Sequence, residues 1–101
     1  MLPVLSLGGL GVISVISNIA PRKFSNMTKD FLSGNIEKSI KTQIESIDLI
    51  NALFSEVNPI PIKAALNLMG YNFGIPRLPL VEMSDIGKEN LKKHMKNYGL
   101  L

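Results

Sequence analysis

The chain has 101 residues, 46% of them hydrophobic, and its 11 basic and 8 acidic side chains give a mild net charge of +3. A chain of this length forms one domain or part of one, and its apolar content suffices for a core, which excludes an intrinsically disordered protein. The sequence contains no cysteine, which excludes disulfides, thiolate metal sites and cysteine nucleophiles and fits a reducing compartment.

The first elements are a short helix and a possible strand. The apolar segment from Leu2 to Leu7 is typical of the last turns of a helix, and Gly8-Gly9 ends it because glycine adopts the left-handed cap conformation cheaply. Val12 to Val15 is β-branched at three of its four positions and predicts a strand. A strand that is apolar on both faces belongs inside a parallel sheet, but the sequence predicts no second strand. Either the strand prediction is wrong or the chain is a piece of a larger fold.

A membrane segment is the alternative for the first 21 residues, which carry no charged side chain. A spanning helix needs about 20 mainly apolar residues, and this stretch is interrupted by Pro3, three glycines and several polar residues. A signal peptide needs positive residues before its apolar run, whereas Arg22 and Lys23 come after it. We therefore expect no membrane association.

Two amphipathic helices are predicted next. Asn18 and Pro21 signal the start of the first and Gly34 its end. Its inward face is expected to be Ala20, Phe24, Met27 and Phe31. Asn35 caps the second helix, the longest, which should end near Ser55 or Glu56. Its inward stripe is expected to be Ile36, Ile40, Ile44, Ile47 and Phe54, widened by Ile50 and Leu53.

Two more helices are predicted in the last third of the chain. Pro59 favours extended backbone at Asn58, and Pro61 does the same at Ile60. A third helix should therefore begin at Pro61, and Gly70 should end it. A loop follows, from residue 71 to residue 82. Ser84 or Asp85 caps the last helix and Gly99 ends it. The inward residues expected for these two helices are Ile62, Ala65, Leu66 and Met69, then Leu91, Met95 and Tyr98.

The polar residues by themselves form no complete catalytic constellation. His94 is the only histidine and is expected on the surface. A chain with one histidine and no cysteine cannot form the usual zinc sites. Lys63 follows two prolines at the start of an apolar helix, where a desolvated lysine could act as a Schiff-base nucleophile. The simpler interpretation is that Lys63 borders the core and binds a carbonyl or carboxylate oxygen.

Other charged and glycine-rich patterns have simple structural interpretations. Lys88, Lys92 and Lys96 share one helix face, which is normally solvated, and no base-reading residues accompany them, so we expect no nucleic-acid partner. The carboxylate pairs Glu45/Asp48 and Asp85/Glu89 are expected to face solvent. The glycines Gly8, Gly9 and Gly11 precede a predicted strand, whereas a dinucleotide fingerprint follows one, so they predict a tight turn.

Several segments resemble one known family. Residues 7–15, LGGLGVISV, and 18–22, NIAPR, are similar to the eighth strand and following helix of dihydrodipicolinate synthase. Residues 53–66, LFSEVNPIPIKAAL, resemble its C-terminal domain, as do RLPL at 77–80 and the ending YGLL at 98–101. The motifs follow the family's order over essentially the whole chain. The segment containing Pro59 and Lys63 favours the synthase over the related sialic-acid and sugar-acid aldolases.

The resemblance implies a mainly α chain: the last βα unit of a (β/α)8 barrel in residues 1–34, then a three-helix C-terminal domain in residues 35–101. It implies a cytoplasmic homotetrameric lyase of lysine (diaminopimelate) biosynthesis that condenses pyruvate with aspartate semialdehyde through a lysine Schiff base and needs no cofactor or metal. The Schiff-base lysine and proton-relay tyrosine of the family lie on segments that this chain does not contain, so Lys63 does not inherit the nucleophile's role.

One site residue carries over. The resemblance implies that the backbone of Ile13 contacts pyruvate and that Gly8, Gly9 and Gly11 shape the approach to its strand. The catalytic residues are absent, so the chain alone is expected to be inactive. Two alternatives remain open. One is a related aldolase of the N-acetylneuraminate lyase type, and the other is a non-catalytic helical module that uses its apolar surfaces for oligomerisation.

Overall fold

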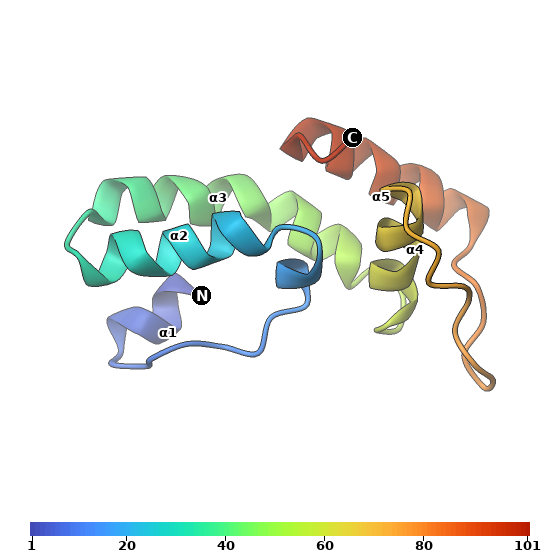
Figure 1. The fold of residues 1–101 in the computed structure, drawn as a ribbon, viewed down its shortest axis with the longest axis horizontal. Coiled ribbons are helices and arrows are strands. Elements are labelled where there is room, and N and C mark those ends of the chain that lie inside the picture. The colour runs from blue at the N-terminus through green and yellow to red at the C-terminus, as the bar shows by residue number, and fades with distance from the viewer. The chain divides into compact units, whose positions relative to one another are not determined.

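The computed structural model describes residues 1–101, which form helices and loops and contain no strand. The α-helices are α1 (Leu2–Ser6), α2 (Pro21–Leu32), α3 (Ile36–Leu53), α4 (Ile60–Leu68) and α5 (Asp85–Tyr98), with a 3₁₀ turn, η1 (Ile16–Asn18), before α2 (Figure 1). The chain divides into two compact units, residues 1–47 and 48–101, whose boundary falls within α3. No helix is long and apolar enough to cross a bilayer.

The predicted strand at Val12 to Val15 is wrong for this chain. Residues 9–14 have no regular structure and connect α1 to η1 as a long loop (Figure 1), while Val15 already has helical backbone angles at the start of η1. A strand is stabilised by hydrogen bonds to a neighbouring strand. No other segment of this chain supplies one, so β-branched side chains alone do not produce a sheet.

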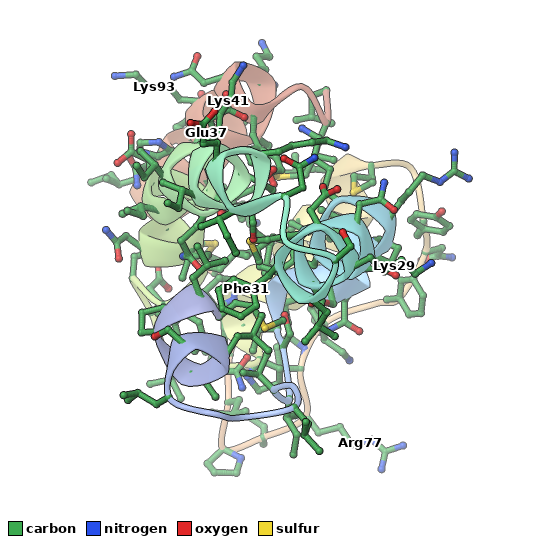
Figure 2. The ribbon with its side chains drawn as sticks, turned by 90° about the vertical axis from the view of Figure 1, so that its left-hand side faces the viewer. Lys29, Phe31, Glu37, Lys41, Arg77 and Lys93 are labelled. Atoms are coloured by element: carbon green, nitrogen blue, oxygen red, sulfur yellow. The ribbon has the colours of Figure 1, made fainter.

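In residues 1–47, the core lies between α2 and its neighbours. The predicted face of α2 is confirmed for Ala20, Phe24 and Met27, which are buried, while Phe31 is half-buried. Figure 2 shows Phe31 between α1 and the pair formed by α2 and α3. Gly34 ends this helical region with a φ of +87°, a conformation that glycine adopts without strain.

The predicted inward stripe of α3 is wrong for its first four isoleucines and for Phe54, which is 55% exposed, whereas Leu53 is buried as predicted and Ile50 is half-buried. Ile36, Ile40, Ile44 and Ile47 are 39–62% exposed, and the residues buried in this part of the helix are Ser39 and Ser46. Ser39 Oγ donates a hydrogen bond of 2.9 Å to the Met27 carbonyl oxygen of α2. A serine is small enough for this direct contact with the backbone of the neighbouring helix, and an isoleucine would hold the two helices apart. The face with more apolar residues is therefore not the covered face.

In residues 48–101, α4 packs on α5. Ile62, Ala65, Leu91 and Met95 are buried as predicted, whereas Leu66 and Met69 are half-buried. Further buried side chains come from the end of α3, the start of α4 and the segment before α5: Leu49, Ala52, Leu53, Ile60 and Met83.

The caps of α5 are confirmed. The Gly87 amide donates to Ser84 Oγ at 3.1 Å at the N-terminus, and Gly99 at the C-terminus has the left-handed φ of +85°. The other predicted bounds differ by one to three residues: α3 ends at Leu53, and α4 begins at Ile60.

Candidate functional site

The glycine turn after α1 forms a regular helix cap. The Gly9 amide donates to the Val4 carbonyl at 2.9 Å, and the Gly8 amide donates to the Leu5 carbonyl at 3.1 Å. Together with the φ of +90° at Gly8, this pair of bonds is the Schellman motif, which satisfies the last carbonyls of a helix. The predicted tight turn is therefore present at this position.

At two of the three glycine positions, the structure of this chain requires glycine. Gly8 has a positive φ, and a Cβ on Gly9 would lie 2.7 Å from the Val4 carbonyl oxygen, which is too close for any side chain. A Cβ on Gly11 would meet nothing within 4 Å. Gly11 therefore has no steric role in the 101-residue chain.

The segment after the turn exposes its backbone. Residues 10–13 make no hydrogen bond within the chain. The Ile13 side chain is fully exposed, and Leu10 is 89% exposed. Unpaired amides and carbonyls beside exposed β-branched side chains are the groups that a neighbouring strand or a small polar ligand would bind. These groups make residues 10–13 the candidate functional site.

Polar contacts fix the far end of this segment. Ser17 Oγ donates to Ser14 Oγ at 2.8 Å, and the Ser17 amide lies 3.3 Å from the same oxygen. The Asn18 side-chain amide donates to the Val15 carbonyl at 2.9 Å. Asn18, predicted as a helix-start residue, therefore binds within the 3₁₀ turn, and Ala20 stands at the N-cap of α2. The unpaired residues are thus held between two hydrogen-bonded ends.

The structure does not bring the other candidate residues of the sequence together. Lys63 Nζ donates to the Ile75 carbonyl at 3.3 Å, as expected for a lysine at the border of a core. His94 is half-buried, whereas we expected it on the surface. No group of three or more His, Asp or Glu side chains could hold a metal ion. The predicted Glu45/Asp48 and Asp85/Glu89 pairs are exposed.

The lysine face of α5 is less exposed than predicted, because Lys88 and Lys92 are half-buried and only Lys96 is exposed. Lys88 Nζ lies 2.6 Å from Glu82 Oε1, and this hydrogen bond raises the pKa of Lys88 above its ordinary value of 10.5. No sequence pattern indicates the role of Glu56, whose carboxylate binds Ser84 at the start of α5. A 28-residue separation hides this contact from any local pattern.

Comparisons with known proteins decide the family. The sequence pattern of the Dihydrodipicolinate synthetase family matches residues 1–98. The chain belongs to this family. A 4-hydroxy-tetrahydrodipicolinate synthase of Thermoanaerobacter sp. (strain X514) is 56% identical over 101 residues, which are all of this chain and 34% of the relative.

Solved structures of the dihydrodipicolinate synthase family have the same fold over this region. The enzyme from Cyanidioschyzon merolae with lysine bound matches 99% of this chain and 34% of its own with a TM-score of 0.95 and 42% identity. A monomeric dihydrodipicolinate synthase variant matches 98% of this chain and 33% of its own, with a TM-score of 0.95 and 47% identity. The chain therefore spans about a third of the length of the dihydrodipicolinate synthases that it matches.

Proposed function

We propose that this chain is the C-terminal part of a 4-hydroxy-tetrahydrodipicolinate synthase, a lyase that condenses pyruvate with aspartate semialdehyde through a lysine Schiff base. The main support is that the backbone of residues 10–13 makes no hydrogen bond within the chain. The chain also matches only about a third of the length of a larger family member. In the whole enzyme this run would become the eighth strand of a (β/α)8 barrel, whose active site lies at the C-terminal ends of its strands.

Ile13 has the one substrate role that we assign. Its side chain is exposed and its backbone is unbonded, which supports a contact made by the backbone to pyruvate. Gly8 and Gly9 fix the turn before this strand. Gly11 would leave room for a neighbouring element, which agrees with the empty space around it. The division into barrel residues 1–34 and a helical domain at 35–101 belongs to the same proposal.

The chain alone should be unable to form the Schiff base. Its polar residues include no constellation that would activate a lysine, and Lys63 donates to a carbonyl oxygen. Incubation with pyruvate and borohydride, followed by intact-mass and peptide analysis, tests this. We expect no reduced pyruvate adduct on any lysine. Specific labelling of Lys63 would overturn the assignment of the nucleophile to the missing part.

A second candidate function has its own observation. Ile36 and Ile40 are exposed and, with Leu2 and Phe31, line an apolar groove of about 420 Å³ between α1, α2 and α3. Such a surface also suits a non-catalytic helical module that binds a second copy of itself. Light scattering of the 101-residue chain tests self-association, which an oligomeric module predicts. Such a module would give no synthase activity when it replaces the matching part of a family enzyme, whereas a true C-terminal part would.

The remaining parts of the proposal concern assembly and location. We propose a homotetramer and a cytoplasmic protein of lysine biosynthesis, without nucleic-acid or membrane partners. The absence of cysteine supports a reducing compartment. The existence of a monomeric variant in the family makes the oligomeric state a property to measure by analytical ultracentrifugation. The names of the synthase relatives favour this activity over that of an N-acetylneuraminate lyase.

A further inference from the structure

A pocket of about 190 Å³ lies in residues 48–101, away from Ile13 in the sequence. Its walls are one side of α4, the loop at residues 74–76 and the chain entering α5. The apolar lining residues are Ile60, Ala64, Leu68, Ile75, Pro76 and Met83. Ile60 and Met83 are buried, so the inner wall is part of the core of this unit.

The outer wall of the pocket is held in place by side chains of α4. The Asn67 side-chain amide donates to the Gly74 carbonyl at 2.9 Å, and its oxygen accepts from the Phe73 amide at 2.9 Å. Lys63 Nζ donates to the Ile75 carbonyl at 3.3 Å. Three hydrogen bonds therefore attach the loop to α4, and a wall formed in advance lowers the entropy cost of binding.

The charges at the pocket are unequal. Three ionisable side chains line it: Lys63, Glu82 and Lys88. Lys88 and Glu82 form an ion pair at 2.6 Å and largely satisfy one another. Lys63 has no acidic partner, and its bond to a neutral carbonyl uses one of the three donors of an ammonium group. The pocket thus carries one uncompensated positive charge beside an apolar wall.

We propose that this pocket binds a small aliphatic monocarboxylate, whose carboxylate accepts from Lys63 and whose chain packs against Ile60, Leu68 and Met83. Pockets for drug-sized ligands enclose roughly 300–1,000 Å³. A pocket of about 190 Å³ therefore suits a ligand with a short aliphatic chain. The proposal uses only residues 48–101, and it stands independently of the proposed synthase activity.

The test is an NMR titration of the isotope-labelled 101-residue chain with hexanoate, with hexan-1-ol as the neutral ligand of the same chain length. We expect saturable shifts around the pocket with a Kd of about 1–10 mM, and binding of hexan-1-ol about fivefold weaker or worse. Lys63→Met keeps the apolar stem of the side chain and should weaken hexanoate binding by about fivefold. Lys93→Met, which removes the same charge at an exposed position on α5 (Figure 2), should leave Kd within about twofold.

A second variant tests the location of the ligand. Ala64→Leu fills the pocket and should abolish binding, and a native-like amide spectrum shows that each variant is folded. Equal affinity for hexanoate and hexan-1-ol, or unchanged hexanoate affinity in Lys63→Met, would overturn the carboxylate specificity. No saturable shifts in the unaltered chain, or unchanged binding in Ala64→Leu, would overturn the site itself.

Discussion

The carboxylate of Glu56 accepts hydrogen bonds from the hydroxyl and from the backbone amide of Ser84. Ser84 Oγ donates to Glu56 Oε2 at 2.6 Å, and the Ser84 amide donates to Glu56 Oε1 at 3.2 Å. The same Ser84 oxygen accepts from the Gly87 amide, so Glu56 orients the residue that caps α5. A negative charge beside a helix N-terminus is also favoured by the helix dipole. The connection after α3 is thereby attached to the beginning of the last helix.

Replacing Glu56 should loosen this attachment. Glu56→Ala removes two hydrogen bonds to a carboxylate, and we expect the free energy of unfolding to fall by about 1–2 kcal/mol, with increased amide exchange in the first turn of α5. Chemical denaturation and hydrogen exchange measure these changes. The control is Glu89→Ala, which removes an exposed acidic side chain of α5. Equal stability of the two variants would show that the Glu56 contact contributes nothing.

Gly87 should not tolerate a methyl group although it lies inside a helix. A Cβ at this position would overlap the Glu56 carboxylate and lie 2.9 Å from Ser84 Oγ. Alanine in place of glycine usually stabilises a helix by about 1 kcal/mol. We expect Gly87→Ala to destabilise the chain by about 1 kcal/mol instead, since it displaces Glu56. Asn90→Ala, an exposed position of α5, should be neutral or slightly stabilising, and a stabilised Gly87→Ala would contradict this account.

Gly9 and Gly11 form a matched pair for the glycine turn. Gly9→Ala places a Cβ against the Val4 carbonyl and should destabilise the chain by about 1–3 kcal/mol. Gly11→Ala meets open space and should change thermal unfolding little in the 101-residue chain. In a full-length enzyme, by contrast, Gly11→Ala should lower stability if another element approaches this residue. Equal effects of both substitutions in the short chain would show that the turn does not depend on Gly9.

Ser39 and Ile40 test which face of α3 is covered. Ser39 is fully buried and donates to the Met27 carbonyl, whereas Ile40 is 42% exposed. Ser39→Leu should cost about 1–3 kcal/mol because it forces α2 and α3 apart. Ile40→Ser should stay within about 0.5 kcal/mol in the short chain. Denaturation of both variants decides between the faces, since the sequence pattern alone predicts the reverse order.

Some features of this fold can be predicted from the sequence, and others depend on tertiary contacts that leave no local pattern. Ser84 and Gly99 were predicted as caps because capping depends on local chemistry, and the burial of Phe24 and Leu91 was predicted from helical periodicity. The predicted burial of Ile36 and Ile40 is wrong because a sequence pattern marks an apolar face without indicating what covers it. The strand at Val12–Val15 failed for a related reason: pairing needs a partner that this chain lacks. The binding of Glu56 to Ser84 depends on tertiary structure and has no local signal.

Lys88 should titrate abnormally late. The hydrogen bond that Lys88 Nζ donates to the Glu82 carboxylate is the largest cause of its raised pKa; burial opposes it, and the charges of Glu82 and Asp85 raise the pKa further. Because the pKa of Lys88 is higher in the folded state, its stabilising contribution is fully present below about pH 10.5 and is lost as the pH rises through the folded value. NMR titration of the Lys88 side chain should show a lower pKa in Glu82→Gln. An unchanged Lys88 pKa in that variant would contradict the ion pair in solution.

The central claim is that this chain can serve as the last third of a dihydrodipicolinate synthase. A chimera tests it most directly: the matching 34% of the Thermoanaerobacter enzyme is replaced by this chain, and turnover of pyruvate with aspartate semialdehyde is measured beside the 101-residue chain alone. We predict turnover by the chimera and none by the short chain. A folded chimera that forms the pyruvate Schiff base but does not turn over, or turnover by the short chain alone, would contradict the account.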